Sequence, residues 1–241
     1  MLRTKQLVNA VLFILTTVLF TGCMYPQERR LQNQVPSEFY IEMTQKAIDQ
    51  YREQEGVLPI VTRPIDTNVF EKYEIDFQKL IPRYLPDVPA NAFEKGGLYK
   101  YVLIDVETKP AVKLVHLGIV SKVADVQQAV NRFKHERGML PVDRPLGNGY
   151  FAINYKQISM KDQTVESVYQ NQFLPLIMNK KGEVGIDYAS DLATYIRSAK
   201  KPLPQDIDPR YELARNALFV PVKSFPYTLE NGEPQLLKID E

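Results

Sequence analysis

Few side chains in this 241-residue sequence have the types and spacing that catalysis or metal binding requires. The chain contains two histidines, His116 and His135, and one cysteine, Cys23. These residues show neither the ligand spacing of a zinc site nor the arrangement of a Cys–His nucleophile. No serine stands in a Gly-x-Ser-x-Gly setting or in a Ser-x-x-Lys setting of the β-lactamase kind. The sequence therefore predicts no metal, no cofactor and no catalytic residue, and it favours a protein that is not an enzyme.

Two pairs of acidic residues are close enough to be tested as acid–base pairs. Asp105 and Glu107 are two residues apart in an expected strand, so their side chains would share a face. Asp206 and Asp208 flank an expected helix start, where a carboxylate caps free backbone N–H groups. Because surface carboxylates are common, an exposed hairpin edge and a helix cap account for both pairs without catalysis.

An arginine–proline pair occurs twice, as Arg63–Pro64 and Arg144–Pro145. A repeated arginine could bind an anion at two equivalent places, so Arg63 and Arg144 are the candidate binding residues. The alternative is a structural role, in an ion pair or at the carbonyl groups of a helix C-terminus, where positive charge is favourable. We favour the structural role.

The first 22 residues have the pattern of a secretion signal. Arg3 and Lys5 precede an apolar run from Ala10 to Phe20, and small residues follow it. The run is shorter than the roughly 20 residues that a helix needs to cross a bilayer. The sequence therefore predicts a cleaved signal peptide over residues 1–22.

Cys23 directly follows Thr21 and Gly22. This segment resembles the lipobox of bacterial lipoproteins, although Phe20 stands where leucine is usual. The resemblance implies cleavage before Cys23 and attachment of a diacylglycerol to its thiol, which would anchor the chain to the membrane. The alternative is a small buried cysteine at the end of a signal anchor. Residues 23–36 are polar and without periodicity, as in a lipidated tether.

The charge balance excludes one class of partner. The chain has 30 Lys and Arg against 29 Asp and Glu, with no basic block. Phosphate contacts need clustered basic side chains, so the sequence predicts no nucleic-acid binding. Removal of residues 1–22 leaves 28 basic and 29 acidic side chains, and no basic patch for a membrane surface.

The sequence contains an internal repeat. Residues 47–59 align with residues 129–141 at a constant offset, and both segments end in Gly-x-Leu-Pro. The alignment continues from 73–77 to 151–155, and from 101–114 to 173–186. Each unit is expected to be a helix, a glycine stop, a strand, a loop, a second strand, a turn and a third strand.

This order predicts an α+β fold built of tandem duplicated units, each a helix packed on a small antiparallel sheet. The first unit is expected over residues 37–118. The second is expected over residues 119–241, with C-terminal helices and a hairpin. Residues 192–204 resemble a third, partial copy, and the sequence alone leaves this open.

The lipobox, the tether and the paired units together resemble uncharacterised lipoproteins of Bacillus-type endospore-forming bacteria. The hairpin around Asp105 and Pro110 is similar to PepSY modules, which regulate extracytoplasmic peptidases. The resemblance to these lipoproteins implies no activity. The lack of catalytic residues and the expected anchor together favour a binding or scaffold protein on the outer side of the cell membrane. Its partner would be an envelope protein or a cell-wall component. The alternatives are an envelope hydrolase and a PepSY-like regulator of a peptidase.

Overall fold

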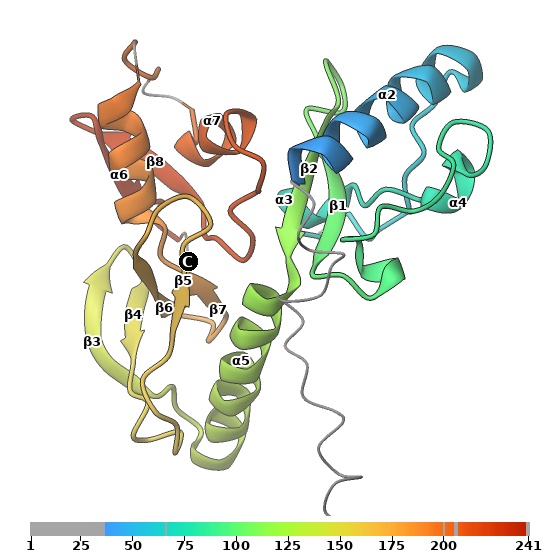
Figure 1. Ribbon diagram of the computed structural model, residues 1–241. Helices are drawn as coiled ribbons and strands as arrows, with labels where there is room; N and C mark the ends of the chain where they lie inside the picture. The colour runs from blue at the N-terminus through green and yellow to red at the C-terminus, as the bar shows by residue number, and fades with distance from the viewer. Residues whose placement is uncertain (1–36, 66, 200, 205–206, 240–241) are drawn as a thin grey trace, which may run out of the picture.

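The computed structural model describes residues 37–65, 67–199, 201–204 and 207–239, so the expected signal peptide, Cys23 and the tether lie outside it. The described chain forms helices packed on small antiparallel sheets, which confirms the expected α+β class. Figure 1 shows the helix of residues 209–215, labelled α7, on the side of the C-terminal half that faces the N-terminal half of the chain. We call residues 37–116 the first unit and residues 117–239 the second unit.

The first unit is a long helix on a two-stranded sheet, with short helices in the connection between them. Its elements are α2 (Ser37–Glu55), α3 (Val69–Lys72), α4 (Phe77–Leu80), the 3-10 helix η3 (Phe93–Lys95), β1 (Tyr99–Ile104) and β2 (Ala111–His116). β1 and β2 pair antiparallel along their whole length. Isolated bridges from Ile60 to Ile75 and from Glu74 to Val102 extend the sheet beyond β1.

The second unit starts with α5 (Leu117–Arg137), directly after the last residue of β2. The expected boundary after residue 118 therefore falls in the first turn of this helix. The sheet that follows has the strands β3 (Val142–Gly147), β4 (Tyr150–Ile153), β5 (Thr164–Glu166), β6 (Phe173–Asn179) and β7 (Val184–Ile186). All pairings are antiparallel, and β6 is central because it pairs with β4, β5 and β7. Figure 1 shows α5 running alongside this sheet.

The C-terminal elements are α6 (Ala189–Ser198), α7 (Pro209–Arg215), β8 (Tyr227–Glu230) and β9 (Glu233–Leu236). The expected start of α7 is confirmed: the Asp208 carboxylate accepts a hydrogen bond from the backbone N–H of Arg210 at 3.0 Å, and a proline stands in the first turn. The expected Asn231–Gly232 turn joins β8 to β9, and both residues have positive φ, as a tight hairpin turn requires.

The segment of residues 218–224 links the two sheets. Its backbone bonds to both sides of Leu114 in β2, with Val220 donating to the Leu114 carbonyl at 3.0 Å. Further along, the backbone N–H of Ile186 in β7 donates to the carbonyl of Lys223 at 2.9 Å. Both pairings are parallel. We call residues 218–224 the linking segment, because it borders one strand from each unit.

The first sheet is buried on both faces, which couples the two units. On one face, Tyr101 and Leu114 pack with Ile48 of α2. On the other face, Val102 and Val115 belong to the same hydrophobic cluster as α5 and the second sheet. The second unit therefore provides the cover for half of the first sheet.

The expected strand at residues 73–77 is wrong in part, because it is present only as isolated bridges. Phe77 begins α4 instead. The Asp76 carboxylate accepts a hydrogen bond from the backbone N–H of Gln78 at 3.1 Å and caps this short helix. The aligned strand expected at residues 151–155 corresponds to β4, which already ends at Ile153. The alternating pattern predicts an extended conformation up to Phe77, but the Asp76 cap starts a helix there instead.

The alignment of the two hairpins is wrong in register. Leu114 and Ile186 are aligned, and both lie on the last strand of their hairpins. The cross-strand partner of Leu114 is Tyr101, whereas the partner of Ile186 is Leu176. The sequence alignment matches Tyr101 with Phe173, so Phe173 is the expected cross-strand partner of Ile186. A shorter turn in the second unit shifts this strand, and an alignment without gaps could not show the shift.

The ends of the two long helices are alike. Gly56 and Gly138 follow α2 and α5 with φ of +71° and +68°, a conformation that glycine adopts without steric cost. The second unit also contains β5 and the C-terminal helices, which have no counterpart in the first. The tandem duplication stays a prediction.

Candidate functional site

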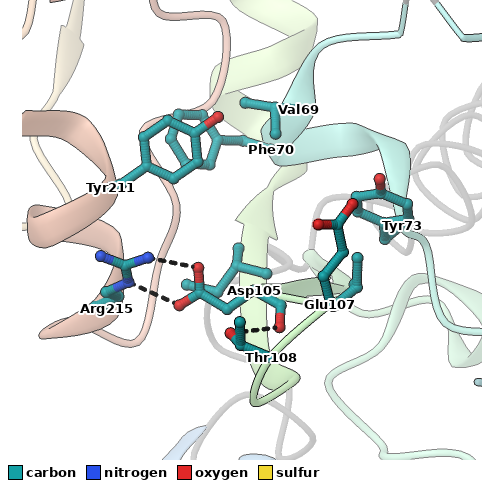
Figure 2. Close-up of a pocket in the computed structure, with 10 residues that line it drawn as sticks. Val69, Phe70, Tyr73, Asp105, Glu107, Thr108, Tyr211 and Arg215 are labelled. Carbon is teal, nitrogen blue, oxygen red and sulfur yellow. Dashed lines mark hydrogen bonds and ion pairs between the residues drawn. The ribbon is translucent and has the colours of Figure 1, made fainter. Parts of the chain in front are cut away.

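A pocket of about 310 Å³ lies between the two units, where α3, the β1–β2 turn and α7 meet. Its size is at the lower end of the range for small-ligand sites. Figure 2 shows Tyr73 and Tyr211 on opposite sides of the space. Asp105 and Arg215 lie along its lower edge in the same view. We call this space the interunit pocket.

An ion pair between Asp105 and Arg215 joins the two units at the pocket. Nε and Nη2 of Arg215 donate to the two carboxylate oxygens of Asp105 at 2.7 and 2.8 Å, a bidentate geometry (Figure 2). Nη1 of Arg215 donates to Glu212 at 2.6 Å. The guanidinium is therefore already neutralised by two carboxylates, and it offers little free positive charge to a ligand.

A buried lysine of β2 holds the end of α7. Lys113 of β2 is 8% exposed, and its ammonium donates to the carbonyl oxygens of Arg215 and Ala217 at 2.9 and 2.5 Å. Burial lowers the pKa of Lys113, while the charge of Asp105 raises it. β2 thus holds the helix that carries Arg215.

The upper wall of the pocket is aromatic. Phe70 of α3 is buried, and its ring lies 5.3 Å from the ring of Tyr211. Two cations of the protein lie over rings of this wall: the Arg210 guanidinium is 5.3 Å from the Phe70 centroid, and the Lys72 ammonium is 5.6 Å from that of Tyr73. The rings of Phe70 and Tyr73 therefore already have cation partners within the protein.

The titration of the pocket groups favours binding over acid–base catalysis. Hydrogen bonds from Arg215 lower the pKa of Asp105, so this carboxylate is ionised at neutral pH. Burial raises the pKa of Tyr211, which keeps its hydroxyl protonated. A carboxylic general acid needs a raised pKa instead. Figure 2 shows the Glu107 side chain directed toward Tyr73 and away from Asp105.

The expected placement of Asp105 and Glu107 on one strand face is wrong. β1 ends at Ile104, and both acidic residues lie in the β1–β2 turn. Asp105 has φ of +52°, a left-handed conformation that aspartate tolerates better than most residues. Of the second acidic pair, Asp208 caps α7, as expected, and Asp206 lies outside the described residues.

The structure does not bring Arg63 and Arg144 together, and neither lines the interunit pocket. Arg63 forms an ion pair with Glu74, which also binds Lys100 at 3.0 Å. Arg144 lies on β3 and is largely exposed, with the neighbouring Asp143 at 3.5 Å. Within the described ranges, neither guanidinium bonds to a helix carbonyl. A binding role for the two arginines stays a prediction.

The histidines lie in separate places. His116 ends β2, and its ring lies edge-on to Tyr99 at 5.5 Å. His135 lies in the last turn of α5, where it is exposed. Over the described part of the chain, no group of three or more His, Cys, Asp or Glu side chains could hold a metal ion. No helix there is both long enough and apolar enough to cross a membrane.

Sequence reasoning missed a buried aspartate. Asp191 is completely buried in α6 and accepts hydrogen bonds from Ser167 at 2.8 Å and from Gln172 at 2.5 Å. Burial raises the pKa of Asp191. The Ser167 hydroxyl also accepts hydrogen bonds from two backbone N–H groups, so it is held in a turn and not presented as a nucleophile. Nothing in the local sequence distinguishes Asp191 from a surface residue of a first helical turn.

Sequence reasoning also missed Tyr211 and Arg215, because their partners lie more than 100 residues earlier in the chain. The only available signal was their position in a short helix after a strong N-cap, which indicates a helix but not its neighbour.

Comparison with known proteins bears on the first unit. No curated protein and no solved structure matches the chain. Residues 37–116 match the family model described as the YphF family N-terminal domain. The matched range begins with the first residue of α2 and ends with the last residue of β2. The first unit, about a third of the chain, is therefore similar to the N-terminal domain of the YphF family.

Proposed function

We propose that this protein is a lipid-anchored binding protein of the cell envelope whose ligand enters the interunit pocket. The observation that carries the proposal is the pocket itself, which has aromatic walls, the Asp105–Arg215 ion pair, and the Glu107 carboxylate, which pairs with no residue that the structure describes. Such a lining is typical of a site that orients a ligand. Among its residues in the described chain, there is no nucleophile with an adjacent base.

The anchor part of the proposal rests on residues 1–36 of the sequence. The signal-like segment and Cys23 support export and lipidation on the outer side of the cell membrane. The resemblance to lipoproteins of Bacillus-type endospore-forming bacteria supports the same location. A tether over residues 23–36 would reach about 45 Å when fully extended, so the folded units could stand clear of the lipid headgroups.

Replacing Cys23 with serine is expected to abolish lipid attachment, because the serine hydroxyl cannot form the thioether. Metabolic labelling with a radioactive fatty acid should mark the wild-type protein and leave the Cys23→Ser variant unlabelled. The variant should appear in the culture medium or keep its signal peptide. Equal labelling of both proteins would show that Cys23 is not the anchor.

Ligand capture at the pocket is tested by photo-crosslinking in intact cells. A photoreactive amino acid replaces Thr108, an exposed residue of the pocket rim, or Glu53, an exposed residue of α2 that serves as the control. We expect a discrete adduct from position 108 and none from position 53. Identical patterns from the two positions, or no adduct from either, would contradict binding at this pocket.

One observation favours the alternative of an envelope hydrolase: Asp105 and Glu107 both line the pocket. Two carboxylates are the usual catalytic pair for glycoside hydrolysis. The ion pair with Arg215 opposes this role for Asp105, because it stabilises the ionised carboxylate and so weakens it as a proton donor. The binding function is therefore the better supported of the two.

A further inference from the structure

We propose that the interunit pocket binds a primary alkylammonium group, the chemistry of a lysine side chain or of a small diamine. The inference rests on the proposed function, because it names the ligand class of the same site. Three features of the pocket support it: the Glu107 carboxylate, which has no ion pair, the aromatic ring of Tyr211, and the tyrosine hydroxyl groups, which accept no hydrogen bond from the described residues.

Among the described residues that line the pocket, Glu107 is the one charged side chain without an ion pair; the nearby Lys72 and Lys113 bond to backbone carbonyl groups. Asp105 and Arg215 satisfy each other, and Glu212 takes a further N–H of the guanidinium. Glu107 has neither an ion pair nor a hydrogen bond to any residue that the structure describes. Glu107 is an exposed carboxylate of the β1–β2 turn, so its charge would repel an anion that enters the pocket, and a neutral ligand would leave that charge uncompensated. A cation compensates it directly.

The aromatic walls favour a cation as well. The face of a tyrosine ring is electronegative and attracts ammonium groups that lie within about 6 Å of the ring centre. The ring of Tyr73 is already occupied in this way by Lys72 of the protein itself. No cation lies over the ring of Tyr211 within the described chain, so this ring is available to a ligand. Figure 2 shows the two tyrosines facing the space from opposite sides.

The available acceptors favour a primary over a quaternary ammonium. A primary ammonium carries three N–H donors, whereas a quaternary one has none. The Glu107 carboxylate and the hydroxyl groups of Tyr73 and Tyr211 line the pocket, and these hydroxyls bond to no residue in the described ranges. Val69 and Val106 line the same space and could contact the apolar stem of an alkyl chain.

The test is calorimetric titration of the purified full-length lipoprotein, in detergent at fixed ionic strength, with n-butylammonium chloride. n-Butanol serves as the neutral probe of the same shape, and glucose as a hydroxyl-rich one. We expect saturable binding of n-butylammonium and none of the two neutral probes at the same concentrations. Glu107→Gln should weaken binding severalfold, the usual effect of losing an ion pair at an exposed carboxylate. Tyr211→Leu should weaken it severalfold as well, the usual effect of losing a cation–π contact. Glu53→Gln, which changes an exposed carboxylate on α2, should leave the affinity unchanged.

Two further arms separate the sources of the amine. Tighter binding of lysine blocked at both its amino and carboxyl ends would identify a peptide ligand, and tighter binding of 1,4-diaminobutane would identify a free diamine. Equal affinity for n-butanol and n-butylammonium, or an unchanged affinity in Glu107→Gln, would overturn the inference. So would a lack of n-butylammonium binding. If the Thr108 adduct persists in that case, the pocket remains a binding site for another ligand class, and if the adduct is also absent, the proposed function fails with the inference.

Discussion

Replacing Phe70 with alanine is expected to lower the free energy of unfolding by about 3–5 kcal/mol, the usual cost of deleting a buried phenylalanine ring. Phe70 is 1% exposed, and it belongs to the hydrophobic cluster that contains residues of both units. Its ring contacts Tyr211 of α7, so the cavity would open where the units meet. Urea unfolding followed by circular dichroism measures the change.

Phe93→Ala is the matched control, because it makes the same substitution at a ring that is 58% exposed. Its effect should stay within about 0.5 kcal/mol, as for most surface changes. A loss for Phe70→Ala as small as the loss for Phe93→Ala would show that the units do not share a core. Two separate unfolding transitions in the Phe70→Ala variant would indicate that the ring couples them.

Gly97→Ala is expected to destabilise the first unit by about 3 kcal/mol or more, at the upper end of the cost of overpacking. A Cβ atom at Gly97 would lie 2.0 Å from the carbonyl oxygen of Asn91 and 2.1 Å from its carbonyl carbon. Asn91 cannot move aside freely, because its side chain accepts a hydrogen bond from the buried Tyr101 hydroxyl at 2.6 Å. Its carbonyl also accepts the N–H of Tyr99 at 3.2 Å, at the start of β1.

Gly56→Ala provides the comparison, because no atom lies within 4 Å of a Cβ built there. This variant carries only the cost of a positive φ in a residue with a side chain, about 1–2 kcal/mol. Thermal unfolding of both variants separates the steric effect at Gly97 from the loss of glycine itself. An equal fall in melting temperature would rule out the clash with Asn91 as the cause.

The local elements of the fold were predictable, because their signals lie within a few residues of each other. The helical spacing of Val123, Val126 and Val130 predicts the buried face of α5, and all three side chains are buried. The Asp208 cap and the Asn231–Gly232 turn are equally local. Each depends on the conformational preference of a residue or on one side-chain hydrogen bond.

The interunit pocket could not be predicted, because it depends on contacts between distant parts of the chain. Asp105 contacts Arg215 because the chain returns to β2 after α7, 110 residues later in the sequence. Lys113 likewise bonds to the carbonyl group of Arg215, which is 102 residues away, so no local sequence pattern could indicate either contact. The same return explains why Asp105 looked like a surface residue of a hairpin. Periodicity shows that a face is buried, but it does not show which segment covers it.

The linking segment sets an order for the maturation of the chain. Neither sheet has its full complement of backbone partners until residues 218–224 are available, long after the residues of β2 have been synthesised. A chain cut short before this point would expose the edge of β2, and unpaired strand edges recruit other chains or proteases. The linking segment therefore decides when both sheets can close, because a chain that lacks residues 218–224 leaves a strand edge of each unit without a backbone partner.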